Sequence, residues 1–443
     1  MEELREELRK VLNEAKNRLI ESFGLEPDVL LPDIRYRVIE EIVSTSITRE
    51  KVELTLTDVI DDAILNKYLG IPVFLSLAWM MFQFTFSVAA PIVDAVDMFF
   101  SWIGEIIGEY ISNSFLASFL ADGIVGGLGT ILVFVPNIFF LFLALSALED
   151  SGYLARVAFI FDRLMRKFRL SGRSIIPHLI GFGCNVPGVM ATRTIAGENE
   201  RILTAITNPL ISCSARLPVY VLFAGVFFPD NSPTIIFSLY MLGIVLAFLI
   251  SFVVGRFFLK GKPSPLIMEL PEYSMPETRT LLMHMWERGI MFVKKAGTVI
   301  LAGVIAIWAL SNLPLGVKSV EESYLGILGH IMEPLFKPFG WDWRIAVSIV
   351  FGFVAKEIVV GALGMIYGVE EEALEHVISQ TMTPLSAYAF MTFVLIYVPC
   401  VATLAAIKGE LGWKWAIFSA IYEVILAYLV ALMIMVIGGV MLS

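Results

Sequence analysis

All three cysteines of the chain stand beside residues that interrupt helices. Cys184 and Asn185 lie in the string Gly-Phe-Gly-Cys-Asn-Val-Pro at 181–187, Cys213 lies between two prolines, and Cys400 directly follows a proline. A cysteine in apolar surroundings is more often inert packing than a ligand. In hydrocarbon, however, the backbone groups freed by a helix break persist only where they line a cavity or are buried in protein. The pattern therefore favours a transport path in which these side chains line the cavity.

The chemistry of these side chains indicates one class of ligand. Thiolate, thioether, carboxamide and carboxylate groups together suit a borderline divalent transition metal, whereas Mg²⁺ and Ca²⁺ prefer shells made only of oxygen. Met190, about one helical turn from Cys184, could add a thioether, although one methionine among 19 is as readily core filler. The four histidines have no metal-ligand spacing, and packing is the favoured role for His178 in the first broken segment.

Charged residues in apolar segments form a second group of candidates, because ionisable groups at membrane depth are costly and usually functional. Lys356 and Glu357 lie at the second break, and adjacent residues do not face each other on a helix, so each needs a partner elsewhere. Glu149 and Asp150 directly follow an apolar span, and Arg216 lies among apolar residues. For Lys356 and Arg216 we favour a structural role in an ion pair that closes a gate, for example between Lys356 and an acidic residue of the other half. For Glu357 a structural role and a transport role are both left open.

Composition places these residues in a membrane protein that crosses the bilayer several times. The chain has 443 residues, 57% of them hydrophobic and 17% charged, with a formal net charge of -10, and its mean hydropathy is +0.79. Each apolar run of about 20 residues is long enough to cross a hydrocarbon core of about 30 Å. The N-terminal sequence MEELREELRK is not a cleavable signal peptide, and an odd number of separated cysteines argues against a disulfide framework.

The apolar runs predict seven full spans and two broken segments. The full spans are expected at 71–93, 125–148, 202–227, 234–259, 297–313, 386–407 and 414–441, and the broken segments at 171–195 and 342–367. Lysine and arginine gather in 150–173 and 256–295, whereas 97–122 has acidic residues and no basic ones. The positive-inside rule therefore places the first two regions in the cytoplasm and the third outside, with a cytoplasmic N-terminus and an external C-terminus.

The two broken segments align when the chain is shifted by 171 residues. The matching residues are Leu164, Arg166, Phe168, Arg173, Gly181 and Phe182 on Leu335, Lys337, Phe339, Arg344, Gly352 and Phe353. The first copy follows a predicted cytoplasmic loop, and the second follows 314–340, which is predicted to be external. We therefore expect an all-α polytopic membrane protein built as an inverted repeat, in which each unit has a broken or re-entrant helix.

Four regions follow from this pattern. They are a cytoplasmic N-terminal helical segment at 1–66, a first membrane half at 67–260, a cytoplasmic loop with an amphipathic helix at 261–295, and a second membrane half at 296–443. Residues 1–24 place apolar side chains on one helical face. That face either packs on the following segment or docks another cytoplasmic protein.

Several function classes are disfavoured. Nothing resembles a Ser-His-Asp or zinc-protease arrangement, so a membrane hydrolase is not expected. Gly261-Lys262 is followed by Pro263 instead of serine or threonine and lacks the earlier glycine of a phosphate-binding loop. We therefore expect a transporter that is not itself an enzyme, with no nucleic-acid partner.

Several long strings between about Asp33 and the C-terminal region match one known family. They are Leu65-Asn66-Lys67 with Pro72, EDSGYLAR at 149–156, GFGCNVP at 181–187 with ATRT at 191–194, CSARL at 213–217, MELP at 268–271, AKE at 355–357 with VVG at 359–361, and YVPC at 397–400. By these strings the chain resembles the membrane domain of the prokaryotic ferrous iron transport protein B family.

The resemblance implies Fe²⁺ uptake across the cytoplasmic (inner) membrane of a prokaryote, through two gate-type repeats embedded in membrane lipid. Fe²⁺ would be the transported substrate, with no permanently bound cofactor. The path, gate or metal-ligating residues that it implies are Cys184, Cys213, Cys400 and Glu357. The sequence pattern by itself adds four further candidates for the path or gate, namely Asn185, Lys356, Glu149 and Asp150.

The resemblance also implies control by a cytosolic GTP-binding domain. Residues 1–32 are far too short to form one. Either the sequence is part of a longer protein or the GTPase is a separate chain, in which case the helix at 1–24 is a natural docking element. A homo-oligomer is a further partner to be tested.

Two other functions are compatible with the pattern. One is a carrier of small organic solutes such as nucleosides, because gate-type repeats are shared more widely; such a site would need several convergent amides, carboxylates and stacking aromatics, and the broken segments offer few. The other is a membrane anchor that senses metal and reports it to a GTPase without moving ions.

Overall fold

The computed structural model describes residues 2–23, 27–46, 55–66, 68–111, 113–259, 270–314, 319–367, 369 and 371–442. Within these residues the regular structure is helical throughout, with no strand. Lys67, Met268 and Glu269 of the family strings, and residues 261–269 of the predicted cytoplasmic loop, lie outside the described residues. The chain forms two compact units, Met1–Ile60 and Asp61–Ser443. The limits of the four predicted regions stay predictions.

The first unit is helical and largely exposed. It contains α1 (Glu2–Phe23), α2 (Pro27–Ser46) and the start of α3 (Leu56–Ile64). Val11 and Leu12 on α1 are both 64% exposed. The role of this apolar face stays a prediction, since exposure does not identify what would cover it.

The second unit contains the remaining helices. Those of the first half are α4 (Gly70–Tyr110), α5 (Ser114–Ser118), the π-helix η1 (Phe119–Gly126), α6 (Gly127–Asp150), α7 (Tyr153–Lys167), η2 (Gly172–Ser174), α8 (Ile175–Gly183), α9 (Asn185–Ala191), η3 (Thr192–Thr194), α10 (Glu198–Thr207), η4 (Asn208–Leu210), η5 (Ser214–Arg216), α11 (Leu217–Phe227), η6 (Pro229–Asn231) and α12 (Ser232–Phe257). Those that follow are α13 (Thr278–Phe292), the π-helix η7 (Val293–Gly297), α14 (Thr298–Asn312), η8 (Val320–Glu322), α15 (Tyr324–Phe336), η9 (Lys337–Phe339), α16 (Trp343–Val354), α17 (Ile358–Tyr367), α18 (Glu371–Thr381), α19 (Pro384–Ile396), α20 (Val401–Leu411) and α21 (Trp413–Leu442).

Six helical stretches of the described residues are long and apolar enough to cross a membrane. They are Gly70–Tyr110, Phe115–Asp150, Glu198–Phe227, Pro229–Phe257, Pro384–Leu411 and Trp413–Val440. The predicted span at 297–313 is represented by a shorter apolar helix, Ile300–Asn312, and the second broken segment by two more, Trp343–Val354 and Ile358–Tyr367. The protein is therefore an all-α, multi-pass membrane protein.

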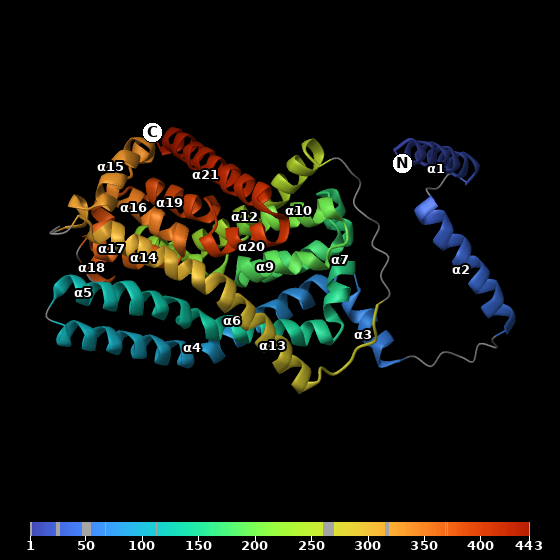
Figure 1. Ribbon diagram of the computed structural model, residues 1–443, viewed down its shortest axis with the longest axis horizontal. Coiled ribbons are helices and arrows are strands. Elements are labelled where there is room, and N and C mark those ends of the chain that lie inside the picture. Colours follow the sequence, from blue (N-terminus) through green and yellow to red (C-terminus); the bar gives the residue numbers. More distant parts are fainter. Residues whose placement is uncertain are drawn as a thin grey trace. The chain divides into compact units, whose positions relative to one another are not determined.

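The predicted external loop at 97–122 is instead helical over most of its length. α4 has 41 residues and pairs lengthwise with α6 (Figure 1). Beyond the predicted end of the span, α4 exposes Met98, Phe99 and Trp102, while the helix still contacts α6 and η1. Trp308 of α14 contacts the rings of Phe115 and Phe119 at centroid distances of 5.3 and 4.9 Å. These contacts extend the helical hairpin past the point where hydropathy falls.

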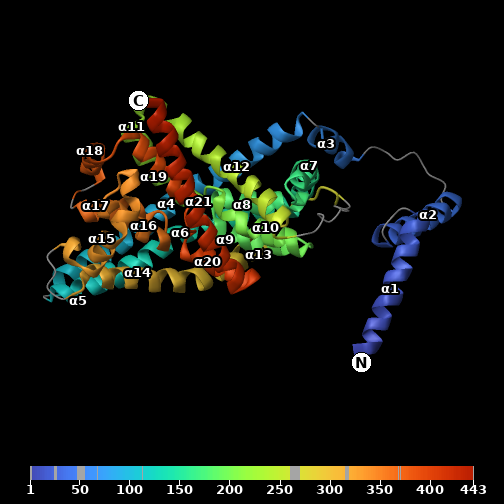
Figure 2. The same ribbon diagram turned by 90° about the horizontal axis from the view of Figure 1, so that it is seen from above.

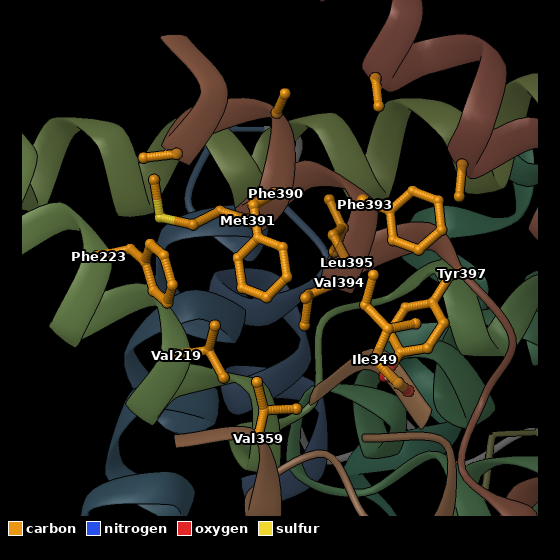
Figure 3. Packing of buried hydrophobic residues seen from close by; sticks show 14 of the residues in the cluster. Val219, Phe223, Ile349, Val359, Phe390, Met391, Phe393, Val394, Leu395 and Tyr397 are labelled. Atoms are coloured by element: carbon orange, nitrogen blue, oxygen red, sulfur yellow. The ribbon is translucent and has the colours of Figure 1, made fainter. Parts of the chain in front are cut away.

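α19 is the most deeply buried long helix of the second half. Its residues from Ala389 to Ile396 are all buried, and Figure 3 shows Phe390 and Met391 beside Phe223 of α11. A helix that is apolar on every side must be surrounded by protein or lipid. Here protein surrounds it, which fixes the chain segment that follows, including Cys400.

A buried arginine joins three parts of the second unit on the predicted cytoplasmic side. The Arg156 side chain is 0% exposed and binds both carboxylate oxygens of Asp61 at 2.9 and 3.0 Å. It also donates to the main-chain oxygens of Gly152 and Pro271 and lies 4.1 Å from the Tyr273 ring centroid. The hydrogen bond to Asp61 raises the pKa of the guanidinium above its ordinary value.

We expect Arg156→Ala to destabilise the folded protein by about 3 kcal/mol, because it leaves a partly buried carboxylate and a carbonyl without their donor. Thermal unfolding in detergent measures this loss. Arg166→Ala is the matched control, because Arg166 pairs with Asp162 only one turn away on α7 and is 37% exposed; its cost should be at most about 0.5 kcal/mol. Equal midpoints for the two variants would contradict the role of Arg156.

Candidate functional site

The residue at which each broken segment is interrupted has the same extended backbone conformation in both segments. α8 ends at Gly183 and α9 begins at Asn185, and the residue between them, Cys184, has φ -152° and ψ 130°. In the second segment α16 ends at Val354, and Ala355 has φ -151° and ψ 130°. These two residues are 171 positions apart, the offset at which the two sequences align.

Two of the predicted full spans are also interrupted. In the span at 202–227, extended backbone at Ile211 and Cys213 separates η4 from η5. In the span at 386–407, Tyr397 to Cys400 separate α19 from α20. Proline at 209, 218 and 399 removes a backbone donor near each break and explains why the helices do not continue.

All four breaks meet at one cavity of about 550 Å³. Its lining includes six of the eight candidate residues, namely Cys184, Asn185, Cys213, Cys400, Lys356 and Glu357. Arg216, Ser214, Asn137 and Thr403 add further polar groups to the lining. Residues more than 200 positions apart in the sequence therefore line one cavity, and the Sγ atom of Cys400 lies 3.1 Å from Thr403 Oγ1.

The cavity groups these side chains without forming a closed coordination shell. Among the described residues, no group of three or more His, Cys, Asp or Glu side chains is close enough to hold a metal ion. The three cysteines are free thiols. The arrangement is a lining with several separate donor groups.

The buried cations bind carbonyl groups at the breaks. Lys356 Nζ donates to the Val398 oxygen at 2.8 Å and lies 3.1 Å from the centroid of the Tyr397 ring. Arg216 donates to the oxygens of Ile211 and Pro209 at 3.1 and 2.9 Å. We expected Lys356 and Arg216 to form ion pairs with acidic side chains, but neither takes part in any of the ion pairs found among the described residues. The reason is that each break frees carbonyl oxygens, and a cation satisfies them at membrane depth.

Neutral side chains serve the same purpose at the first break. Asn208 Nδ2 donates to the Pro177 oxygen at 2.6 Å, and Ser214 Oγ donates to the Gly183 oxygen at 2.9 Å. In the amide orientation that satisfies both partners, Asn185 donates to the oxygens of Gly181 and Asn208 at 3.0 and 3.2 Å. The role of Asn185 in this geometry is to support the break from within the cavity wall.

Gly188 allows Asn208 to reach this position. A Cβ atom at Gly188 would lie 2.7 Å from Asn208 Oδ1 and 2.9 Å from the Pro177 oxygen. Both distances are below ordinary contact, so a larger residue would displace the amide from the carbonyl that it satisfies.

The other two candidates lie outside the lining of this cavity. Glu149 accepts a hydrogen bond from Arg288 Nη2 at 2.9 Å, and the main-chain oxygen of Asp150 accepts one from Ser274 Oγ at 2.8 Å. Both contacts tie the end of α6 to α13 and the segment before it. His178 is 2% exposed and its ring nitrogens lie 2.7 Å from the Ser174 oxygen and 3.2 Å from Thr207 Oγ1, which is a packing role.

A second cavity of about 660 Å³ adjoins the first. It is lined by Asp97, Glu105 and Asp122, and it shares Phe134 and Glu357 with the first cavity. Glu357 therefore lies in the lining of both.

Sequence reasoning missed one buried carboxylate. Glu423 on α21 is 0% exposed; its Oε1 accepts a hydrogen bond from Ser419 Oγ at 2.8 Å, while Oε2 has no hydrogen-bond partner among the described residues. Its signal in the sequence was an acidic residue in the middle of an otherwise apolar run. Asn208 carried a similar signal, an amide before proline within a predicted span.

Two family models match the chain. A model described as "Gate: Nucleoside recognition" matches residues 131–227 and 293–414, which contain all four breaks. A model described as "Ferrous iron transport protein B C terminus" matches residues 236–288. No solved structure matches the chain.

Curated relatives align with most of the chain. A protein named Fe(2+) transporter FeoB from Methanocaldococcus jannaschii is 48% identical, over 98% of this chain and 66% of its own length. Proteins of the same name from Staphylococcus aureus strain COL and Campylobacter jejuni are 41% and 38% identical, over 92% and 89% of this chain and 66% and 67% of their own lengths. The chain belongs to the ferrous iron transport protein B family. It spans 66% of the length of the first two of these relatives.

For this member of the ferrous iron transport protein B family, Asn208 provides a direct test of the first break. We expect Asn208→Asp to lower stability by about 1–3 kcal/mol, because the isosteric carboxylate cannot donate to the buried Pro177 oxygen. Thermal unfolding in detergent near neutral pH measures the change.

Asn208→Ala is the variant to compare with Asn208→Asp, because it removes the whole side-chain amide and not just the N–H donor. An aspartate variant as stable as the unmodified protein would show that the carbonyl does not depend on this donor.

Proposed function

We propose that this protein moves Fe²⁺ across a prokaryotic cytoplasmic membrane into the cytoplasm. The observation that carries the proposal is the single cavity at which four helix breaks bring together Cys184, Cys213, Cys400 and Glu357. Relatives that share its sequence are named Fe(2+) transporters. Sulfur donors with one carboxylate suit a borderline transition metal and disfavour Mg²⁺ and Ca²⁺.

The charges around the cavity support passage in place of permanent binding. Arg216 is fixed on carbonyl groups, so its positive charge stays close to any ion in the cavity. A divalent cation would then be held by thiols that lose protons as they bind it. Repulsion from this guanidinium limits the affinity, which favours release.

The second cavity fits an approach route for the ion. Its carboxylates, Asp97, Glu105 and Asp122, raise the local concentration of cations, and they belong to the region that the charge pattern places outside. In this account the ion passes from the acidic cavity by Glu357 to the three thiols. Glu149 and Asp150, which lie elsewhere, would act on helix packing and not on the ion.

A flux assay tests the role of the thiols. Proteoliposomes that contain a metal-sensitive dye should admit Fe²⁺ under anaerobic conditions, and Cys184→Ser should slow entry about tenfold or more, the scale seen when a metal site loses a supporting group. Glu149→Gln is the control, because it changes a carboxylate outside the cavity lining; its flux should stay within about twofold of the unmodified protein. Unchanged flux in the cysteine variant would refute the assigned role of the thiol.

The binding of Fe²⁺ should strengthen as the pH rises from about 6 to 7.5, because a thiol must lose its proton to become a ligand. Isothermal titration calorimetry in two buffers of different ionisation enthalpy counts the protons released. Cys184→Ser should release fewer protons than the unmodified protein. Binding that is independent of pH, with no proton release, would exclude thiolate ligands.

Nucleosides are the main alternative cargo, because the matching gate model carries the words nucleoside recognition. The volume of about 550 Å³ is sufficient for a small solute. Among the described residues, however, the lining offers only Phe86 and Phe134 as aromatic rings, and stacking surfaces are what such a solute requires. Thermal stabilisation by adenosine or uridine, with no effect of Fe²⁺, would favour this alternative.

We further propose that a cytosolic GTP-binding domain or chain regulates transport. The relatives at 66% coverage have about half as much chain again beyond the part matched here, which leaves room for such a domain. If the protein were a metal sensor instead, Fe²⁺ would change GTP hydrolysis by that partner while no ion entered the liposomes.

A further inference from the structure

An ion pair joins the two parts of the chain that the gate model matches, residues 131–227 and 293–414. It lies away from the thiols, near the other ends of the helices that follow them. Arg193, in the first range, donates from Nε to both carboxylate oxygens of Glu410, in the second range, at 2.8 and 2.7 Å. Its Nη2 also contacts Oε1. Arg201 donates to the main-chain oxygen of Glu410. Glu410 therefore accepts from two arginines of the first half, on its side chain and on its backbone.

The ion pair and two of the thiols lie at opposite ends of the same two helices, α9 and α20. Cys184 directly precedes α9 and Cys400 directly precedes α20. α9 and α20 contact each other, and Figures 1 and 2 show them side by side. Val186 and Val189 of α9 belong to the same buried cluster as Ala402 and Ala406 of α20. Each helix thus begins at a thiol, and the ion pair lies at or just beyond its other end.

The geometry makes this contact stronger than an ordinary surface ion pair. The Glu410 side chain is only 5% exposed, whereas Arg193 is 48% exposed. Exposed ion pairs contribute little, but an arginine that binds both oxygens of a buried carboxylate is favoured by its planar shape and its charge. Without Arg193, Glu410 would be a buried carboxylate that has lost its side-chain donor.

We propose that Arg193 and Glu410 form a latch that fixes the separation of Cys184 and Cys400. α9 has 7 residues and α20 has 11, so both are short rods in which a shift at one end reaches the other. The charge pattern places the latch on the cytoplasmic side. On the basis of the proposed function, the ion leaves the thiols toward the cytoplasm when the latch opens. Both residues are positioning residues, since neither lines the cavity.

Thiol labelling tests the latch without any metal. The full chain in detergent is treated with a maleimide, and labelling rates at Cys184 and Cys400 are read by mass spectrometry. Arg193→Glu and Glu410→Arg should each raise both rates about fivefold or more, because loss of the contact frees the two helices. The double variant with exchanged charges should return both rates to within about twofold of the unmodified protein.

Arg166→Glu is the matched control, because it reverses an arginine charge in a pair confined to α7; it should leave both rates unchanged. If the charge-reversed variants do not fold, Arg193→Lys replaces them in the test. It keeps the positive charge but loses the guanidinium that binds both carboxylate oxygens, so its labelling rates should be intermediate. Rates that stay unchanged in both single variants, or that the charge exchange does not restore, would overturn the latch. Because no metal is used, such a result is distinct from a failure of Fe²⁺ transport.

Discussion

The structure depends on how the carbonyl oxygens freed by four helix breaks are satisfied. A helix that stops within a membrane leaves acceptors that lipid cannot satisfy. Here Ser214, Arg216 and Lys356 supply donors at three of the four breaks, and Asn208 donates to the Pro177 oxygen within α8, next to the first break. Two of these donors are basic side chains buried at membrane depth: Nη1 and Nη2 of Arg216 each bind a carbonyl oxygen, and Lys356 Nζ binds the Val398 oxygen beside the Tyr397 ring. The breaks can therefore converge on one cavity, and the thiols that stand at them become its lining.

The two halves solve this problem in related ways. Cys184 and Ala355, 171 residues apart, have nearly the same backbone angles, which supports the proposed repeat. The side chains at the two positions differ: the first half contributes a thiol, and the second half contributes the neighbouring Lys356 and Glu357. Of these two aligned breaks, the first therefore supplies a soft donor. The second supplies a carboxylate and also Lys356, which donates to the Val398 oxygen at the other break of its own half. The opposite orientation of the two units remains our prediction from the charge pattern.

The sequence predicted the helical class and the broken segments, and six of the eight candidate residues named from it line the cavity. Glycine, proline and cysteine are local signals, so breaks can be read from them. The partner of Lys356 could not be predicted. It is the main-chain oxygen of Val398, and every residue has such an oxygen, so the sequence does not mark it. The contact of Arg193 with Glu410 spans 217 positions and depends on how the two halves pack. The length of α4 was underestimated because packing against α6 stabilises helix beyond the apolar run.

The central claim is that sulfur atoms from separate breaks meet the ion in one cavity. X-ray absorption at the iron edge, on protein loaded anaerobically with Fe²⁺, measures the ligand atoms directly. The account predicts sulfur scatterers at a distance of about 2.3 Å, as for other metal–thiolate bonds, and their loss when Cys184, Cys213 and Cys400 are all replaced by serine. A spectrum with oxygen or nitrogen ligands alone in the unmodified protein would contradict it.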